Sequence, residues 1–598
     1  MSCEDKDALS KEEFLQVVRH LKIPAGVATN TQAAHAKDKL DVSKLPFGRR
    51  LRAKFAVDGA PWTFLAFVVA LMLIFGIWQL VTYVSDTDKR AALGWGVIMA
   101  KVTAGVLYPT LFFMILSMSR WLATLARYSY WVARFVNFDR AQSFHIKISI
   151  FAMLMATLHA IGHLTGTFLY SSRPGREATV ETVVGQSRTY RQYVATLPGI
   201  TGISALGCFY LMAIFAIPWL KRRNYEVFQL SHLLMFPFVG LLMAHGTWAI
   251  LQPPMLGYWL AFPTLLVIVE RLTRICRGFI RIPAKFSILD DDTVAIEVRH
   301  PHGKDWPYDA GQYIMLQVPE VSFFQWHPFT ISLCHKDMLS LHIKTDGNWT
   351  SRLRSENLRF VGLDGPYGAP AQRFYDFERS VLIGSGVGVT PFSSILMNLE
   401  KRQDLPKARG TSHSRSRAAS RSSSPGSDAT RVKSIREGEK TRGRVLGSPP
   451  KVRCDFHWVV RDKNYLLWFS DLLNRVETAE SIHKDLSIRI CTHVTAKRKK
   501  LSTLIFRWLL ENHRTETDLS PLTGLRNKTE FGRPDFSTIL LDHYNEAKSE
   551  GFTGKVGVFY CGAPVVGMLI ADACHVLTAR ASEERYDLRY VFMLEVFG

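Results

Sequence analysis

The chain has 598 residues, 47% of them hydrophobic and 21% charged, and its 74 basic and 52 acidic residues give a net charge of +22. Because one domain typically holds about 100–200 residues, and residues 62–270 are crowded with apolar runs while residues 400–450 hold almost none, a single soluble globule is excluded. The basic residues collect beside the apolar runs and are not interleaved with aromatic residues. A membrane therefore accounts for the charge better than nucleic acid does.

Six apolar stretches reach about 20 residues, the length that a transmembrane helix needs. They lie at residues 61–84, 94–119, 142–170, 199–220, 225–250 and 255–275. Lysine and arginine are concentrated before the first stretch and after the second, fourth and sixth. These loops and both termini are therefore predicted to be cytoplasmic. The loop 171–198 also carries four arginines and must lie outside, but the other loops outweigh it.

The first 55 residues are polar and charged, so no cleavable signal peptide is expected. Five of the eight cysteines lie beyond the apolar half and none has CxxC spacing. This usage indicates a reducing compartment for the soluble part and argues against a zinc site.

The second half of the chain changes to short strands separated by glycine and proline turns. Runs at 293–298 and 313–318 predict a small antiparallel barrel that ends near residue 375. A parallel α/β domain is then predicted from the strands at 380–383, 456–460 and 556–561 and from a helix at 391–399. Residues 407–450 contain ten serines and eight arginines without a hydrophobic period, so a disordered insert is expected there.

Five histidines lie inside two of the apolar stretches: His145, His159 and His163 in the third, and His232 and His245 in the fifth. Ionisable residues inside a bilayer are costly and are candidates for function. The intervals of 14 positions from His145 to His159 and 13 from His232 to His245 correspond to about four helical turns, or roughly 20 Å. Because both helices are predicted to run outward, His145 and His232 share an inner level, and His159 and His245 share an outer one.

Two facing imidazoles at each of two depths could ligate two stacked haems, with no open position left at either iron. A single membrane histidine is more simply a hydrogen-bonding partner of a neighbouring helix. A proton relay or packing role is the alternative for the whole set. Because the four histidines form two pairs at two depths, haem ligation is favoured over a proton relay or a packing role.

The soluble half carries three motifs that suit nucleotides. The segment 327–330, with sequence HPFT, ends an apolar strand, and the segment 344–350 offers cationic and amide groups for a pyrophosphate. The segment 384–391, GSGVGVTP, lies between a strand and a helix, where glycines admit a phosphate and the helix N-terminus favours an anion. Cys561-Gly562 ends a further strand at a ligand-binding edge of the sheet, and a buried cysteine before a turn is the alternative.

In this order the motifs resemble those of the NADPH oxidase family, within the ferric-reductase-like transmembrane flavocytochromes, over roughly residues 60–598. Further similar stretches are Tyr225–Phe228 before His232, Asp364–Gly368, Trp458–Asp462, and the pair Thr523–Leu525 and Gly532–Asp535. The last pair is most similar to the calcium-regulated branch of the family.

The resemblance implies a multi-domain membrane protein of the plasma membrane. Its expected parts are a cytoplasmic segment 1–58, a six-helix transmembrane di-haem domain 59–278, an antiparallel β-barrel for FAD at 279–376 and a ferredoxin-reductase-like α/β domain for NADPH at 377–598. The implied activity moves electrons from cytosolic NADPH through FAD and two b-type haems, held by the histidine pairs, to oxygen outside, forming superoxide.

The resemblance also implies the cofactor-binding residues. For FAD these are His327, Pro328, Phe329, Thr330, His342, Lys344, Trp349, Thr350 and the aromatic Phe597, which Gly598 follows. For NADPH they are Gly384, Gly386, Gly388, Thr390, Pro391, Arg461, Arg533, Cys561 and Gly562. Arg461 and Arg533 suit the adenosine phosphate because guanidinium forks match phosphate oxygens.

Two features bear on regulation by a kinase or a calcium-dependent partner. The stretch Leu9–Phe14 resembles the end of an EF-hand, but Lys6 would occupy a ligand position and lysine cannot bind calcium. It is therefore interpreted as a remnant or a helix start. In the insert, Ser420 and Ser424 lie among arginines that could pair with an added phosphate, and a passive linker is the alternative.

The acceptor site is predicted at Lys101 and His163. Lys101 lies about 10 Å below the outer end of the second helix, and His163 lies one turn above His159. A positive charge there would stabilise oxygen as it becomes an anion, whereas a lysine that only reaches the outer headgroups is the alternative. The family usually has arginine where Lys101 lies, which keeps a ferric-chelate reductase as an alternative. A third hypothesis is a transporter or channel whose histidines relay protons.

Overall fold

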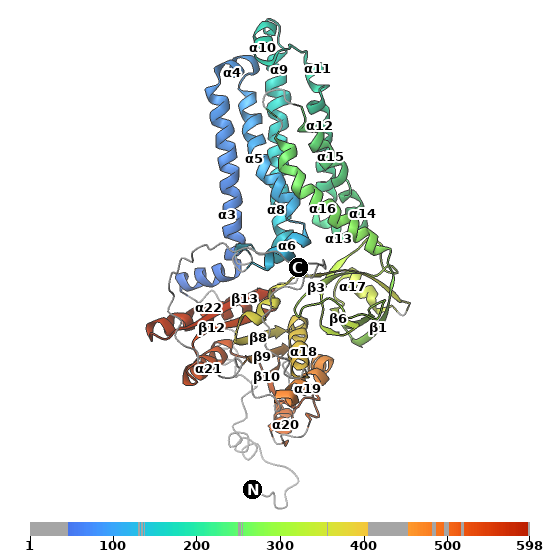
Figure 1. Ribbon diagram of the computed structural model, residues 1–598, viewed down its shortest axis with the longest axis vertical. Coiled ribbons are helices and arrows are strands. Elements are labelled where there is room, and N and C mark those ends of the chain that lie inside the picture. The colour runs from blue at the N-terminus through green and yellow to red at the C-terminus, as the bar shows by residue number, and fades with distance from the viewer. Residues whose placement is uncertain are drawn as a thin grey trace, which may run out of the picture.

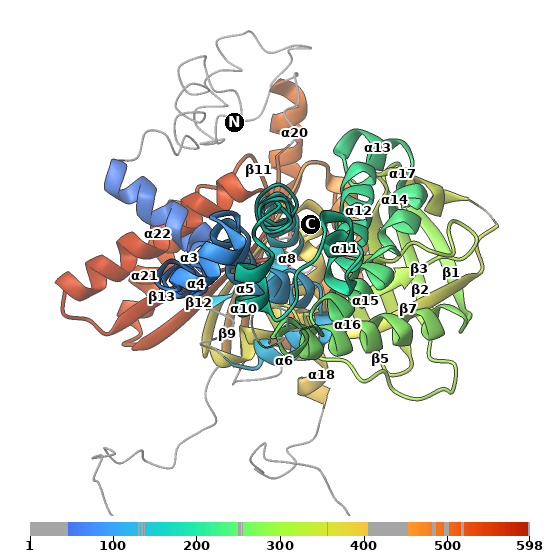
Figure 2. The same ribbon diagram turned by 90° about the horizontal axis from the view of Figure 1, so that it is seen from above.

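The computed structural model describes residues 46–595, except 130–131, 133–134, 137, 249–252, 254, 356, 405–451, 481–485, 496–500, 513 and 516–518. The predictions for the EF-hand-like stretch, the insert 407–450 and Phe597 lie outside the described residues. Figure 1 shows a bundle of long helices standing on two parts that contain β-sheets. Figure 2, which looks along the bundle, shows these two parts side by side beneath it.

The long helices of the bundle follow the predicted apolar stretches. They are α3 (Phe47–Ser85), α5 (Gly96–Leu116), α8 (Ala141–Ile161), α12 (Leu197–Phe215), α15 (Met235–His245) and α16 (Leu256–Gly278). Their shared core buries Val68, Leu111, Ile148, Phe238 and Leu260. Many large apolar side chains on their other faces are exposed, as expected for helices that face lipid rather than water.

Two stretches that were each predicted as one helix are divided. The fourth ends with α12, and α13 (Pro218–Arg223) begins at a proline, which has no backbone N–H to continue the helix. The fifth consists of α14 (Tyr225–His232) and α15, separated by residues 233–234. The third stretch is continuous, but it passes from α8 through a π-helical turn, η3 (Gly162–Thr167), into α9 (Phe168–Ser171). Such turns often mark functional positions.

Among the described residues, six helices are long and apolar enough to cross a membrane, and five of these segments are in the bundle. The sixth is α22 (Pro564–Glu583), which instead packs Ile570 and Leu577 against a β-sheet. The sixth helix of the bundle is α16, at the predicted position. The short helices α4 (Thr87–Leu93), α10 (Glu177–Val184) and α11 (Tyr190–Val194) lie at the end of the bundle opposite the sheets (Figure 1).

The first sheet contains seven antiparallel strands in the order β4-β3-β7-β1-β2-β6-β5. The strands are β1 (Ile282–Asp290), β2 (Thr293–Arg299), β3 (Tyr313–Gln317), β4 (His327–Thr330), β5 (Leu333–His335), β6 (Met338–Lys344) and β7 (Phe360–Tyr367). Alternate residues such as Ile296, Leu316 and Leu341 form its buried core. Since β4 and β6 are also in contact, the sheet curls on itself as a barrel does.

The second sheet contains six parallel strands in the order β11-β10-β9-β8-β12-β13. The strands are β8 (Arg379–Ser385), β9 (Val452–Val460), β10 (Leu486–Val494), β11 (Thr529–Phe531), β12 (Gly554–Cys561) and β13 (Leu588–Glu595). Helices α18 (Thr390–Asp404) and α19 (Ser470–Glu480) cover one face, and α21 (Phe536–Ser549) and α22 cover the other. The predicted fold class, a helical bundle followed by an antiparallel and then a parallel sheet domain, is confirmed.

Candidate functional site

Three of the four paired histidines are oriented in the same way. In His145, His159 and His245 the Nδ1 atom lies within hydrogen-bonding distance of a backbone carbonyl oxygen on a neighbouring segment. The distances are 3.0 Å to Met114, 2.8 Å to Ala100 and 2.9 Å to Pro198, respectively. An imidazole that donates through Nδ1–H presents an unprotonated Nε2, which is the form that binds a metal.

The outer pair is close together within the bundle. The ring centroids of His159 and His245 are 6.1 Å apart, with the rings inclined by 75°. His163 lies against His159 at 4.8 Å and stacks on Phe168, and its Nδ1 is buried without a hydrogen-bond partner among the described residues. The outer level therefore gathers three imidazoles, as the spacing predicted.

The inner pair differs from the outer one. His145 is the fifth residue of α8, and His232 is the last residue of α14, next to the irregular turn before α15. The two imidazoles are near enough to interact electrostatically. His232 has a buried Nδ1 with no hydrogen-bond partner in the described part of the chain, so no backbone carbonyl fixes its orientation.

This donor set fits haem better than a bare metal ion. The described residues contain no cluster of three or more His, Cys, Asp or Glu residues around one point, which a protein-only site for zinc or iron would need. Two imidazoles per level suffice when a porphyrin supplies the other four ligands of the iron.

Lys101 lies on α5 beside Ala100, whose carbonyl oxygen contacts His159. Its Nζ atom is 5.6 Å from the centre of the Tyr83 ring, and the Nζ atom of Lys89 is 5.4 Å from that same ring. The side chain of Lys101 thus lies over the Tyr83 ring near the outer end of the bundle, and it is near enough to His163 to interact with it electrostatically.

A buried ionic network joins the bundle to the antiparallel sheet. Arg274 on α16 donates through Nε to Asp364 on β7 at 2.6 Å, and Arg277 donates to the other carboxylate oxygen at 2.5 Å. Burial would raise the pKa of Asp364, but Arg274, Tyr367 and Arg277 lower it below its ordinary value. In the sequence both arginines look like positive charge flanking the sixth apolar stretch, and the Asp364–Gly368 motif is the signal that could have indicated their partner.

The same network fixes the loop between α5 and α8. Glu270, also buried on α16, accepts hydrogen bonds from the Ser119 hydroxyl at 2.9 Å and from the backbone N–H groups of Arg120 and Trp121. These donors start α6 (Arg120–Arg127), so the carboxylate caps that helix. The bundle and the sheet are thereby held at a defined junction.

The HPFT strand forms an aromatic and polar cluster with α17 (Asn348–Ser351). The ring of Trp349 lies 4.3 Å from that of His327 and stacks on Phe329 at 6.0 Å. Within the described residues, the Thr330 hydroxyl and the Trp349 indole nitrogen are buried without hydrogen-bond partners. Burial lowers the pKa of His327 to about 4, so this ring is neutral near pH 7. Flat rings beside unused polar atoms fit a flavin.

His342, Lys344 and Thr350 are engaged elsewhere. His342 points to the junction of the two sheets, where its Nδ1 is 2.7 Å from the Ser332 hydroxyl and its ring is 4.5 Å from Phe469. Lys344 is paired with nearby carboxylates, and Thr350 accepts a hydrogen bond within its own turn. The predicted FAD residues therefore divide into the cluster around HPFT and Trp349 and these three separate positions.

The two nucleotide motifs of the parallel sheet meet, although about 170 residues separate them. β8 and β12 are neighbours, so the turns that follow them lie side by side. A Cβ atom on Gly388 would lie 2.5 Å from the Cys561 carbonyl oxygen, and one on Gly562 would lie 2.7 Å from Ser385 Cβ. Only glycine permits this approach.

The rest of the GSGVGVTP turn is also tightly constrained. Gly386 has a φ of +57°, which favours glycine, and its carbonyl oxygen accepts a hydrogen bond from the Trp458 indole at 3.1 Å. A Cβ on Gly384 would lie 3.0 Å from Val389 Cα. Thr390 and Pro391 then begin α18, whose N-terminus is at the carboxyl edge of the sheet, where nucleotide phosphates bind in such folds.

Arg461 and Arg533 lie on the same edge of the sheet. Arg461 follows β9 directly, and Arg533 lies two residues beyond β11. Both side chains are exposed, and neither forms an ion pair among the described residues. Two uncommitted guanidinium groups at this edge suit a phosphate group on the adenosine end of a nucleotide.

Three family models match consecutive parts of the chain. They are the ferric reductase like transmembrane component at residues 102–243, the FAD-binding domain at 279–371 and the ferric reductase NAD binding domain at 377–575. Dual oxidase 1 of Caenorhabditis elegans is 28% identical over 88% of this chain and 34% of its own length. Dual oxidase 2 of Rattus norvegicus is 29% identical over 82% and 31%.

The chain thus spans about a third of the length of these relatives. Among solved structures, a ferredoxin NADP+ reductase from Neisseria gonorrhoeae with bound FAD and NADP is 14% identical, with a TM-score of 0.30. That alignment covers 52% of this chain and 97% of that one. The chain therefore carries ferric-reductase-like transmembrane, FAD-binding and NAD-binding domains, and dual oxidases of the NADPH oxidase family are its homologues.

Proposed function

We propose that this protein is an NADPH oxidase of the plasma membrane that transfers electrons from cytosolic NADPH across the bilayer to molecular oxygen and forms superoxide. The observation that carries the proposal is the set of imidazoles at two depths of the bundle, three of them with Nδ1 on a backbone carbonyl and Nε2 free. Its termini and both sheets are on the cytoplasmic side. A kinase acting on Ser420 or Ser424, or a calcium-dependent partner, regulates it.

In this proposal His145 and His232 hold an inner b-type haem, and His159 and His245 hold an outer one. Bound haem iron supplies a centre that gains and loses one electron at a time. The chain contributes neutral imidazoles whose hydrogen-bonded carbonyls fix the ring orientation. An iron held by two imidazoles would keep no open position, so the acceptor would be bound by residues of the chain and not by the metal.

FAD occupies the cluster of His327, Pro328, Phe329, Thr330 and Trp349, with further contacts proposed for His342, Lys344, Thr350 and Phe597. Bound FAD supplies the conversion of a two-electron hydride donor into single electrons. The Thr330 hydroxyl and the Trp349 indole offer the hydrogen bonds that orient a polar ring. The neutral ring of His327 adds an uncharged surface to this proposed FAD site.

NADPH occupies the carboxyl edge of the parallel sheet. The glycines of residues 384–388 admit its pyrophosphate, and the first turn of α18, which begins with Thr390 and Pro391, offers the anion the backbone N–H groups of its residues other than the proline. Arg461 and Arg533 pair with the adenosine phosphate. Cys561 and Gly562, packed against Gly388, border the nicotinamide end.

The acceptor site lies at the outer end of the bundle, where Lys101 and His163 stabilise the anion that forms. A second candidate function, ferric-chelate reduction by the same relay, is favoured by the lysine at position 101. Lysine keeps the positive charge, but it lacks the planar guanidinium fork that arginine would offer.

The deciding experiment gives NADPH to the purified full-length protein and offers oxygen or a ferric chelate as acceptor. A Soret band together with cytochrome c reduction that superoxide dismutase abolishes would support the oxidase. Reduction of the ferric chelate alone would support the second candidate. Protein without a Soret band would remove both and leave the transporter or channel hypothesis.

A further inference from the structure

α14 carries the proposed inner-haem ligand at one end and contacts the antiparallel sheet along its length. Its partner is the β3–β4 loop, residues 318–326, which leads directly into the HPFT strand. The Glu226 carboxylate accepts a hydrogen bond from the Ser322 hydroxyl at 3.0 Å, and the Gln229 amide donates to the Phe324 carbonyl oxygen. The ring of Tyr225 lies 6.3 Å from that of His327.

The β3–β4 loop is itself a fixed platform. The backbone N–H groups of Val321 and Ser322 both donate to the Val318 carbonyl oxygen at 3.0 Å. The Phe323 ring packs on Phe279, just beyond the end of α16, with centroids 5.3 Å apart. Ser322 is only 6% exposed. The loop therefore offers α14 a defined docking surface and not a mobile one.

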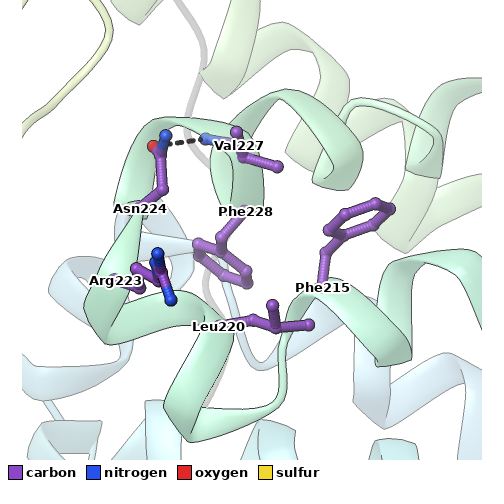
Figure 3. Close-up of a pocket in the computed structure, with 6 residues that line it drawn as sticks. All are labelled: Phe215, Leu220, Arg223, Asn224, Val227 and Phe228. Atoms are coloured by element: carbon purple, nitrogen blue, oxygen red, sulfur yellow. Dashed lines mark hydrogen bonds between the residues drawn. The ribbon is translucent and has the colours of Figure 1, made fainter.

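Within the bundle, α14 is connected to α15 through an irregular turn. Residues 233–234 keep a right-handed helical backbone, but tighter turns replace the α-helical hydrogen bonds directly after His232. α14 also packs on α12 and α13, but a hollow of about 330 Å³ remains between them, lined by Phe215, Leu220, Val227 and Phe228 (Figure 3). The contacts with the β3–β4 loop therefore add to the constraint that α12 and α13 place on α14.

His232 is the paired histidine that depends on this constraint. His145, His159 and His245 each contact a carbonyl oxygen of a neighbouring bundle segment, whereas the Nδ1 of His232 has no partner among the described residues. Because side-chain direction follows the helix that carries it, a small displacement of α14 would rotate this imidazole. No hydrogen bond would restore its orientation.

We infer that Glu226, Gln229 and Ser322 are positioning residues for the inner haem: by docking α14 on the β3–β4 loop they set the orientation of His232. The axial ligation of the inner haem then responds to the FAD-binding domain, while the outer haem does not. This inference rests on the proposed function, since it requires haem on His145 and His232. It adds a coupling between the flavin domain and one specific ligand.

The test compares variants of the purified full-length protein by electron paramagnetic resonance of the two low-spin haems and by redox titration. In Glu226→Ala/Ser322→Ala, the signal and midpoint potential of the inner haem should shift. The inner haem should also be lost about tenfold faster, as expected when an outer-shell partner is removed. The outer haem should keep both properties. The single variant Glu226→Gln retains an oxygen acceptor for the Ser322 hydroxyl and should therefore keep the wild-type signal of the inner haem.

A matched control removes a contact between the bundle and the sheet that does not involve α14. The Thr124 hydroxyl accepts a hydrogen bond from the Gly368 backbone N–H at 3.2 Å, so Thr124→Ala weakens the same junction and should leave both haem signals unchanged. If the double variant does not assemble, Ser322→Ala alone should shift the signal and midpoint potential of the inner haem in the same direction but by less.

Three outcomes would overturn the inference while leaving the proposed function intact. They are an unchanged inner signal in every α14 variant, equal shifts of both haems, and a Thr124→Ala shift as large as that of the double variant. Wild-type protein without haem would instead remove the proposed function, and the inference with it.

Discussion

The candidate site of the bundle and that of the parallel sheet consist of different kinds of groups. In the bundle the site consists of side chains, three of which are oriented by one carbonyl oxygen each. In the parallel sheet it consists largely of backbone, where the turn after β8 packs on the turn after β12 with no room for a Cβ atom. The bundle site should therefore fail when one side chain is removed, and the nucleotide site should fail when one methyl group is added.

The largest effect is expected from the inner pair. His145→Leu or His232→Leu removes a proposed axial ligand and should abolish the proposed inner haem, because one imidazole cannot hold low-spin bis-His iron. Reduction of the outer haem by NADPH should then stop, while FAD content is unchanged. Haem quantification and stopped-flow spectra measure both effects. A variant that kept both haems would contradict the ligand assignment.

The histidine pairs could be predicted from sequence because ionisable residues stand out in apolar stretches and because helical rise converts spacing into depth. The local backbone could not be predicted in the same way. In the run from 225 to 250, Pro237 lacks the N–H that would donate to the Leu233 carbonyl oxygen, and this signal for an interruption after His232 was overlooked. The π-helical turn that carries His163 depends on close packing, in which Gly162 and Gly166 lie against Ala100 and Gly96.

Long-range contacts mark a second limit of the sequence. The glycines of residues 384–388 and the pair Cys561-Gly562 were recognised as separate motifs, but their contact follows from the strand order, which places β12 beside β8. Arg274 illustrates the same limit. It was counted as loop charge, yet it is buried against Asp364, about 90 residues away. A single sequence specifies such partners only through the fold.

The second prediction tests a side chain that lies beside the outer pair. Lys101→Met removes the positive charge at the outer end and should slow superoxide formation about a hundredfold, the cost of losing one stabilising group for a developing anion. Haem content and haem reduction by NADPH should stay intact. As a control, Lys89→Met removes a neighbouring cation that already pairs with Asp86 at 2.9 Å, and it should change the rate little. Unchanged superoxide output in Lys101→Met would exclude the proposed role.

The third prediction adds a methyl group to the nucleotide site. Gly388→Ala brings a Cβ to 2.5 Å from the Cys561 carbonyl oxygen and should cost about 1–3 kcal/mol, as other overpacked substitutions do. NADPH binding, measured by fluorescence quenching, should weaken about tenfold, while both haems remain. Gly386→Ala is the matched control. Its Cβ would meet nothing within 4 Å, so it tests the strain of the positive φ without crowding Cys561. Equal NADPH affinity in Gly388→Ala and wild type would contradict the proposed packing.

The smallest effect concerns histidines that bind no cofactor in this proposal. His457 on β9 and His543 on α21 are both buried, and burial lowers the pKa of each to about 3, whereas an unfolded histidine titrates near 6.5. Between these values the unfolded chain binds more protons than the folded one. Stability is therefore complete above pH 6.5 and declines as the pH falls toward 3. Tryptophan fluorescence can report the Tm of the α/β domain through buried Trp458.

A variant separates this titration from the loss of packing. The Nδ1 of His543 lies 2.9 Å from the Tyr590 hydroxyl, and His543→Gln keeps an amide that can hydrogen-bond this hydroxyl but cannot titrate. Its Tm should fall less steeply with pH between 6.5 and 4 than that of the wild type, even if its Tm at pH 8 is lower. The pH dependence of the Soret band should be the same in both proteins, since the bundle histidines are untouched. Parallel Tm profiles for the two proteins would show that His543 does not supply the pH dependence.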